Sequence, residues 1–339
     1  MKVLVTGHDG YLGVGVVARL RGRGDEVVGL DTELFGHRGL GPAERPDQTH
    51  RIDIRDVPGD LLEGVDVVVH LAGLSNDPLG ERSPVVTDAV NHVATLRLAD
   101  LAREHGVRRF VFASTCSVHG GAGDATVDED TPVAPLTAYA RSKADAEVGL
   151  AKRADGTMAV TVLRLGTVYG AAPRLRADLV VNNLVGWALT TGEVILRSDG
   201  TAWRPLVHVD DVADALTAAT DLDDPLHVLN VVGADGDLQI IDVARRIGEL
   251  TGAQVRQAEG AGTDPRSYRV DGSRLRRVLP AGVATRHLDD GIRELIAAYR
   301  AHGFRREDLD VTLRRNAWLD RLVADGRLTA DLRWRAQEP

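Results

Sequence analysis

The first 31 residues constrain the fold of this chain more than any other segment. Residues 2–6 are an apolar run that predicts a buried strand, and this run leads directly into the glycine-rich segment 7–13. A helical pattern follows at once, and a second apolar run, residues 26–31, ends in Asp31. A strand, a glycine turn, a helix and a strand in this order predict the start of a parallel sheet that binds a dinucleotide.

The glycines and the terminal acid of this segment have different expected functions. Glycines let the backbone approach a pyrophosphate, whose charge is held by amides at the helix N-terminus. Asp31 would accept hydrogen bonds from ribose hydroxyls and would repel a phosphate there, so we expect NAD rather than NADP as the cofactor. The expected cofactor contacts in this segment are Gly7, Gly10, Tyr11, Leu12, Gly13 and Asp31.

Strand and helix patterns alternate through the first half of the chain. Further strands are expected at residues 49–54, 65–72, 109–115 and 161–166, with helices near residues 84–104 and 137–153. This alternation predicts an α/β fold with a Rossmann-type, doubly wound parallel sheet. In such sheets ligands collect beyond the carboxyl ends of the strands, where residues 7–13, Asp31, residues 70–73 and Thr115 would lie together.

The pattern changes after Gly170, where proline and glycine interrupt the segments more often. Helices are expected near residues 178–191, 210–220 and 240–251. We therefore divide the chain into an NAD-binding domain at residues 1–170 and a smaller C-terminal substrate-binding α/β subdomain at residues 171–303, some segments of which return to the first domain. Residues 304–339 carry Leu and Trp at helical spacing among Arg and Asp, which predicts an amphipathic helical tail against the body.

Charge and composition exclude several classes of partner. A net charge of -9 over 339 residues offers no general attraction to nucleic acid or to an anionic membrane. No apolar run approaches the length of a bilayer span, and a core strand begins at residue 2, which leaves no room for a signal peptide. The single cysteine excludes an intrachain disulfide. We expect a cytoplasmic protein with no nucleic-acid partner, no membrane partner and no metal site.

Tyr139 and Lys143 are the strongest candidates for chemistry. Their spacing of four places both side chains on one face of a helix, where the ammonium can favour the phenolate. A free tyrosine titrates near pH 10 and needs such help to act as a base at neutral pH. This spacing also occurs in helices without function. Together with the dinucleotide site and Thr115 at the end of an apolar run, however, the pair indicates proton-coupled hydride transfer.

Further motifs are spread over nearly the whole chain. They are Thr6-Gly7-x-x-Gly10-x-x-Gly13, Asp53-Ile54-Arg55-Asp56, His70-Leu71-Ala72, Asn91, Ser114-Thr115 with Val118-x-Gly120, Tyr139-x-x-x-Lys143, Arg164-Leu165-x-x-Val168-Tyr169-Gly170, Arg204-x-x-Val207-His208-Val209-Asp210-Asp211, and Arg266-Ser267-Tyr268 with Asp271-x-Ser273. As a set they resemble the signatures of the extended short-chain dehydrogenases/reductases, in the NAD-dependent epimerase/dehydratase family. Members of that family mostly act on nucleotide-linked sugars.

The resemblance implies a role for each matching residue. Tyr139 would be the acid/base, Lys143 would bind the nicotinamide ribose and lower the pKa of the phenol, and Thr115 would position the reacting sugar oxygen. Further implied cofactor contacts are Asp53, Ile54, Leu71, Ala72 and Gly73. His70, Asn91 and His208 are better explained by structural roles.

The candidate substrate contacts lie downstream of these motifs and in nearby loops. They are Ser75, Asn76, Thr115, Cys116, Ser117, Arg174, Asn183, Arg204 and Arg266. Arg204 and Arg266 match positions that grip the diphosphate of a nucleotide sugar, and the alternative is that they are exposed charges or surface ion pairs. Asn76, Arg174 and Arg176 would contact the sugar or be exposed to solvent.

One departure from the family pattern reduces the number of reactions that we expect this chain to catalyse. Dehydratases of this group carry an acidic pair immediately after the catalytic Thr, and here those places hold Cys116 and Ser117. Elimination would therefore lack its acid and its base. Cys116 is either an acid/base next to a ketone or a small packed thiol, and we favour the packed thiol.

The resulting hypothesis is an NAD-dependent nucleotide-sugar epimerase that acts at C4 through a transient 4-keto sugar, by removal and return of a hydride. The main alternative is an NAD(P)-dependent ketoreductase or dehydrogenase. C3/C5 epimerases, dehydratases and a non-catalytic redox sensor follow. We also expect a homodimer, because relatives pair the helices that correspond to residues 84–104 and 137–153. The alanines at 138, 140, 144 and 146 would permit close approach, or would pack under the sheet of the same chain.

Overall fold

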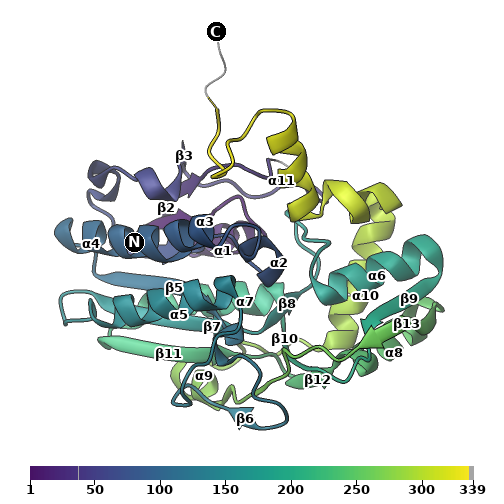
Figure 1. The fold of residues 1–339 in the computed structure, drawn as a ribbon. Coiled ribbons are helices and arrows are strands. Elements are labelled where there is room, and N and C mark those ends of the chain that lie inside the picture. Colours follow the sequence, from purple (N-terminus) through teal and green to yellow (C-terminus); the bar gives the residue numbers. More distant parts are fainter. Residues whose placement is uncertain (37, 336–339) are drawn as a thin grey trace.

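The computed structural model describes residues 1–36 and 38–335. Its main sheet has seven strands in the order β11-β7-β5-β4-β1-β2-β3, and all neighbours are parallel (Figure 1). The strands are β1 (Lys2–Thr6), β2 (Glu26–Asp31), β3 (Gln48–Arg51), β4 (Val67–His70), β5 (Arg109–Thr115), β7 (Ala159–Leu165) and β11 (Leu226–Val231). From β1 the chain first builds the sheet outward through β2 and β3, and then returns to the other side of β1 to add β4, β5, β7 and β11. This reversal is typical of a doubly wound sheet. The predicted Rossmann-type fold is therefore confirmed.

Helices cover both faces of this sheet. One face packs against α1 (Gly13–Gly22) and α7 (Val209–Ala218), and the other packs against α4 (Ala94–Glu104) and α5 (Ala138–Ala151). Successive strand residues point to opposite faces, so Leu4 lies in one core while Val3 and Val5 lie in the other. Because both faces are buried, the strands are continuous apolar runs rather than alternating ones.

A smaller lobe lies beside the carboxyl ends of the strands, to the right in Figure 1. Its third apolar core is formed mainly by α6 (Val180–Thr191), α8 (Ile240–Thr251), α10 (Leu288–His302) and the parallel pair β9 (Glu193–Ser198) and β13 (Gln254–Gly262). A three-stranded sheet joins the lobe to the main domain through β8 (Thr167–Tyr169), β10 (Trp203–His208) and β12 (Asp237–Gln239). Both β11 and α7 lie within the predicted second domain but belong to the main sheet and its core.

Short elements complete the described chain. They are α2 (Asp77–Gly80), α3 (Pro84–Asp88), β6 (Thr126–Val127), β14 (Arg269–Val270), α9 (Ser273–Val278), the 3-10 turns Ile54–Asp56, Gly59–Leu62, Cys116–His119 and Ala219–Asp221, and the π-helical turns Ala89–Val93 and Asp308–Thr312. The predicted helix 84–104 is thus formed by α3, a π turn and α4 in succession. No helix among residues 1–36 and 38–335 has both the length and the apolar character needed to cross a bilayer.

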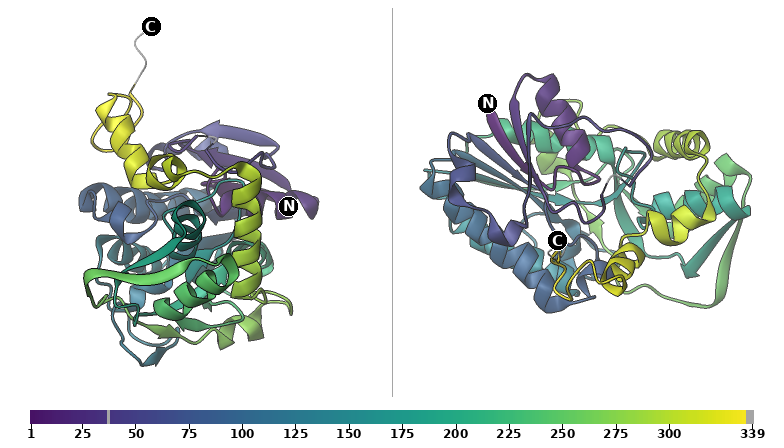
Figure 2. Two further views of the ribbon diagram at one scale, coloured as in Figure 1. Left: turned by 90° about the vertical axis from the view of Figure 1, so that its right-hand side faces the viewer. Right: turned by 90° about the horizontal axis from the view of Figure 1, so that it is seen from above.

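The C-terminal tail packs on the main domain. Its helix α11 (Arg315–Ala324) lies beside the π-helical turn Asp308–Thr312 and near α2, toward the top of Figure 1, and Figure 2 shows the tail from two further sides. Trp318, Leu319 and Leu322 of this helix are buried in the same core as Ile54. The tail is helical over only part of its length, since residues 325–335 form a turn and an isolated bridge between Leu328 and Trp334.

Candidate active site

A cavity of about 900 Å³ lies between the carboxyl ends of the main strands and the smaller lobe. Most of the residues singled out from the sequence line this one cavity. They are Gly7, Gly10, Tyr11, Leu12, Gly13, Asp31, Asp53, Ile54, Leu71, Ala72, Gly73, Ser75, Asn76, Thr115, Ser117, Tyr139, Lys143, Asn183, Arg204 and Arg266. Arg174 and Cys116 are not part of the lining.

The glycine turn between β1 and α1 leaves space that any side chain would fill. Gly7 has a φ of +72°, and a Cβ there would lie 2.8 Å from the amide nitrogen of Ala72 at the end of β4. A Cβ on Gly13 would collide with the carbonyl oxygens of Gly7 and His8. The turn therefore brings bare backbone and the N-terminus of α1 to the cavity, which suits the diphosphate of a dinucleotide.

Two acids lie where the adenosine half of a dinucleotide would bind. Asp31 ends β2, and its carboxylate accepts hydrogen bonds from the amides of Glu33 at 2.8 Å and Asp9 at 3.2 Å. Burial raises the pKa of Asp31 above its usual value. Asp53 is also partly buried, yet hydrogen bonds from Arg55 hold the pKa of its carboxyl below its usual range. These residues and the glycine turn fit NAD.

Thr115 and Tyr139 meet at the opposite end of the cofactor region. Thr115 ends β5, while Tyr139 lies in the first turn of α5, whose N-terminus is capped by Thr137 through a bond from the Ala140 amide at 3.1 Å. A hydrogen bond with the Thr115 hydroxyl acts on the Tyr139 phenol. Lys143 follows one turn later, and its Nζ donates to the carbonyl oxygen of Ala113 at 2.8 Å.

The protonation states of this pair differ from the sequence-based expectation. Burial raises the pKa of Tyr139 to about 12, although the bond to Thr115 and the charge of Arg176 act in the opposite direction. Burial also lowers the pKa of Lys143 to about 7. We expected Lys143 to favour the phenolate, but its ammonium is bonded to a backbone carbonyl and the burial of the phenol dominates.

Glu147 fixes the helix that carries these residues, and we did not single it out from the sequence. Its carboxylate accepts hydrogen bonds from Arg164 of β7, from Nε at 3.1 Å and from Nη2 at 2.8 Å, and a further one from the hydroxyl of Ser114 on β5. All three residues are buried. A usable signal was present, because Glu147 lies four residues after Lys143 and therefore on the same face of α5.

His70 and Asn91 have the structural roles expected of them. The ring nitrogens of His70 lie 2.6 Å from the hydroxyl of Thr6 and 2.8 Å from that of Thr95, and burial lowers its pKa to about 3. Asn91 accepts a hydrogen bond from the amide of Leu74 and donates one to the carbonyl oxygen of the same residue. Both side chains are satisfied inside the protein, and His70 is neutral.

An ion pair that the sequence did not reveal organises the loop after β4. Arg176 and Asp178 are 2.6 Å apart and well buried. Arg176 donates to the hydroxyl of Ser75 at 3.0 Å, and Asn76 donates to Asp178 at 2.6 Å. Arg176 is therefore a buried wall residue of the cavity rather than an exposed charge.

Two predicted substrate contacts lie outside the cavity lining, which corrects those predictions. Arg174 is turned to the glycine turn, where its Nε donates to Asp9 at 2.7 Å. Cys116 is fully buried, its thiol donates to the carbonyl oxygen of Arg164 at 3.2 Å, and burial raises its pKa. The packed-thiol interpretation of Cys116 agrees with this position. A free cysteine behaves as a small hydrophobic residue, so the Cys116 thiol is stable in the apolar core rather than in the polar cavity.

Arg204 and Arg266 line the cavity and are ion-paired at the same time. Each donates to Asp264, Arg204 at 2.8 Å and Arg266 at 2.9 Å, and Arg266 also donates to Asp77 at 2.9 Å. Bonds to these carboxylates raise the pKa of Arg266. Neither arginine is an isolated surface charge, because Asp264 and Asp77 balance both guanidinium groups where they line the cavity.

A Rossmann-type sheet, a glycine turn and a Tyr–Lys pair beside one shared cavity define an extended short-chain dehydrogenase/reductase. Comparison with known proteins is more specific. Residues 3–231 match the model of the NAD dependent epimerase/dehydratase family, so the chain belongs to that family and its cofactor is NAD.

Individual relatives differ in their reactions. The chain is 30% identical to a dTDP-glucose 4,6-dehydratase of Streptomyces griseus, over 97% of this chain and 99% of that protein. It is 28% identical to an uncharacterized UDP-glucose epimerase of Bacillus subtilis, over 88% and 97% of the two chains. Among solved structures it resembles MoeE5 in complex with UDP-glucose and NAD, with a TM-score of 0.77, 30% identity and 88% and 99% coverage. The family alone therefore does not select the reaction.

Proposed function

We propose that this protein is an NAD-dependent epimerase of nucleotide sugars that inverts C4 through a transient 4-keto sugar. The observation that carries the proposal is that Thr115, Tyr139 and Lys143 line one cavity while Cys116 and Ser117, rather than two acids, follow Thr115. Of the two places that hold acids in related dehydratases, Cys116 is turned into the core and Ser117 bears a hydroxyl. This arrangement supports oxidation and re-reduction at a single carbon.

The roles of the side chains follow from their positions. Bound NAD supplies the hydride acceptor, a positive charge near the phenol and, once reduced, the returning hydride. Tyr139 Oη exchanges a proton with the reacting sugar hydroxyl, and the Thr115 hydroxyl holds the same sugar oxygen by a hydrogen bond. Because the pKa of Tyr139 is about 12 in this structure, its deprotonated form needs additional positive charge nearby.

Other carboxylates of the cavity are already engaged. Asp77 accepts from Arg266 at 2.9 Å and from the hydroxyl of Thr137 at 2.7 Å, while Asp178 is paired with Arg176. The oxygens of both carboxylates are taken up by these bonds, so neither is free to contact a bound sugar. Neither acid therefore replaces the missing acidic pair of a dehydratase.

The test is an assay of UDP-glucose, UDP-glucuronic acid and dTDP-glucose with purified protein and NAD below the substrate concentration. We expect an isomer of unchanged mass whose C4 configuration is inverted, detected by mass spectrometry and NMR, with no net change in NAD. Loss of water from the product would identify a dehydratase. Consumption of one reduced nicotinamide per product would identify a ketoreductase or dehydrogenase, and either result would contradict the proposal.

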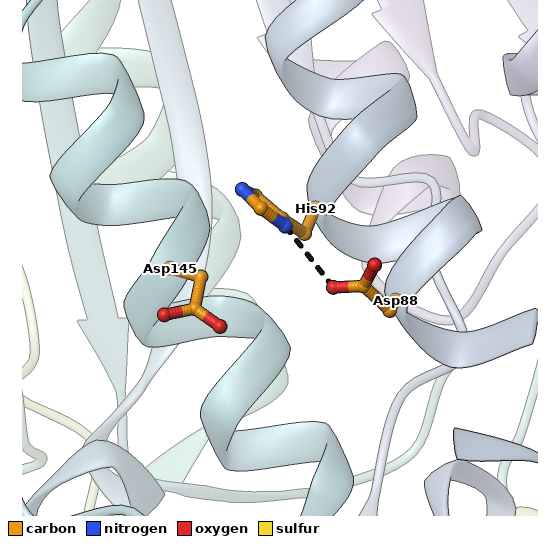
Figure 3. A group of neighbouring side chains, drawn as sticks. All are labelled: Asp88, His92 and Asp145. Atoms are coloured by element: carbon orange, nitrogen blue, oxygen red, sulfur yellow. Dashed lines mark hydrogen bonds and ion pairs between the residues drawn. The ribbon is translucent and has the colours of Figure 1, made fainter. Parts of the chain in front are cut away.

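We also propose that the protein acts as a homodimer through α4, α5 and the turns that precede α4. Three large apolar side chains are exposed in this region, Val85 on α3 by 80% and Val93 on the π-helical turn and Val148 on α5 by 54% each. Figure 3 shows Asp88, His92 and Asp145 on the same surface, with His92 Nδ1 3.0 Å from Asp88. A pairing of two copies would cover these valines.

Light scattering after gel filtration tests this pairing. The wild type is expected at twice the chain mass, and Val148→Glu is expected at the chain mass because a charge would be buried at the contact. Leu226→Glu, which alters an apolar residue that is 41% exposed on a different surface, is the control and should leave the mass unchanged. A monomeric wild type would refute the dimer.

A further inference from the structure

The C-terminal tail contributes two residues to the lining of the cavity, Arg315 and Leu332. Neither the family match, which ends at residue 231, nor the motifs of the chain assign them a role. Leu332 is buried in the same apolar core as Ile54, which also lines the cavity. Arg315 begins α11. The tail therefore reaches the cavity at two points along the region that fits NAD.

Contacts fix the tail across the loop that follows β2. The indole nitrogen of Trp334 donates to the carbonyl oxygen of Thr32 at 2.7 Å, and that of Trp318 donates to the carbonyl oxygen of Leu34 at 3.0 Å. Arg55, the residue that binds Asp53, also donates to the carbonyl oxygen of Asp331 at 3.0 Å. These bonds join the tail to the adenosine side of the cofactor region rather than to the nucleotide-sugar side.

Arg315 contacts the loops that follow two strands. Its guanidinium lies 4.3 Å from the ring centroid of Phe35, after β2, and donates to the hydroxyl of Ser75, after β4, at 3.2 Å. It also lines a small second cavity whose lining includes Asp9 of the glycine turn, after β1. Because β1 lies between β4 and β2 in the sheet, the two contacted loops flank the end of β1, where the glycine turn begins.

The charge of Arg315 is poorly compensated. Among the described residues, no carboxylate lies within ion-pair distance of it, and the hydroxyl of Ser75 that it binds is shared with Arg176. Burial and the charge of Arg176 lower its pKa to about 9, although Asp178 and Asp31 act in the opposite direction. Two guanidinium groups that converge on one neutral oxygen beside a cavity indicate an anionic ligand group.

We propose that Arg315 binds the diphosphate of NAD, so that the C-terminal tail forms one wall of the cofactor site. Backbone amides at the N-terminus of α1 would bind one side of the diphosphate, and the guanidinium of Arg315 would bind another. The diphosphate of the nucleotide sugar is the less suitable partner, because Arg315 lies against Phe35 in the loop after β2, on the adenosine side of the cofactor region. This inference depends on NAD binding and is independent of the reaction at C4.

The test compares ligand binding by Arg315→Gln and by the matched control Arg314→Gln, which changes an exposed arginine one residue earlier. Calorimetry of nucleotide-free protein would give the affinity for ADP-ribose, which carries the diphosphate, and for adenosine, which lacks it. We expect Arg315→Gln to weaken ADP-ribose binding about tenfold or more, to leave adenosine binding unchanged and to retain less NAD through dialysis. Arg315→Lys, which keeps the charge, should recover part of the affinity.

The outcomes separate this inference from the other proposals. Unchanged ADP-ribose binding in Arg315→Gln would overturn the inference, and so would an equal loss for adenosine and ADP-ribose, since that would mean a general disturbance of the site. A loss of UDP binding with normal ADP-ribose binding would also overturn it, by assigning the charge to the nucleotide sugar. Failure of the wild type to bind NAD would instead refute the cofactor site itself.

Discussion

Replacing Glu147 by alanine should destabilise the protein strongly, because it would leave a buried charge without a partner. The carboxylate of Glu147 is 8% exposed and the guanidinium of Arg164 is 7% exposed, so solvent cannot take over the lost contacts. Arg164 would lose its bonds from Nε and Nη2, and Ser114 would lose an acceptor. Breaking one side of such a pair costs about 3–5 kcal/mol in the free energy of unfolding.

Urea unfolding, followed by circular dichroism, measures this loss. Glu249→Ala is the matched control, because Glu249 is an exposed acid on α8, away from the proposed dimer surface, and its replacement should change the free energy of unfolding by no more than about 0.5 kcal/mol. The double variant Glu147→Met with Arg164→Met should recover much of the stability, since it removes both charges. The reasoning is refuted if Glu147→Ala and Glu249→Ala are equally stable.

Three further predictions concern the glycine turn, His70 and Cys116. Gly13→Ala should weaken NAD binding at least about tenfold, because its Cβ would displace the turn, whereas Gly22→Ala at the other end of α1 meets open space and should bind NAD normally in the same titration. Between pH 3 and 6.5 His70 is protonated in the unfolded chain but not in the folded protein. The free energy of unfolding should therefore rise with pH by up to ~1.4 kcal/mol per pH unit in this range. Urea titrations at several pH values should show that His70→Gln loses this slope. Cys116 should not react with Ellman's reagent until the protein is unfolded, and rapid labelling of the native protein would contradict its burial.

The sequence predicted the parts of the structure that local patterns determine. Strand β5 and helix α8 have the expected bounds, because an apolar run and a 3.6-residue repeat each fix their element without help from distant residues. The strand expected at 49–54 ends at Arg51, since Asp53 turns its carboxylate to the Arg55 amide and caps a 3-10 turn instead. Most of the predicted site residues line one cavity, because the loops after parallel strands meet at one edge of a sheet.

The residues that were missed depend on contacts between distant segments. Arg315 reaches the cavity because α11 is tied to the loop after β2 by the bond from Trp318 to the carbonyl oxygen of Leu34, and nothing in the pattern of residues 304–339 specifies that position. Arg174 and Arg176 look alike in the sequence, yet one pairs with Asp9 beside the turn and the other with Asp178 in the cavity wall. The pKa of Tyr139 likewise depends on the burial of the phenol, which the spacing to Lys143 does not describe.

The central claim is that Tyr139 exchanges a proton with the sugar while a hydride passes to NAD. Stopped-flow absorbance of reduced nicotinamide, after mixing NAD-loaded protein with UDP-glucose in a single turnover, measures that step most directly for the wild type and for Tyr139→Phe. We predict that hydride transfer becomes at least about 100-fold slower in the variant while its bound NAD is unchanged. Hydride transfer at the wild-type rate in Tyr139→Phe would contradict the mechanism.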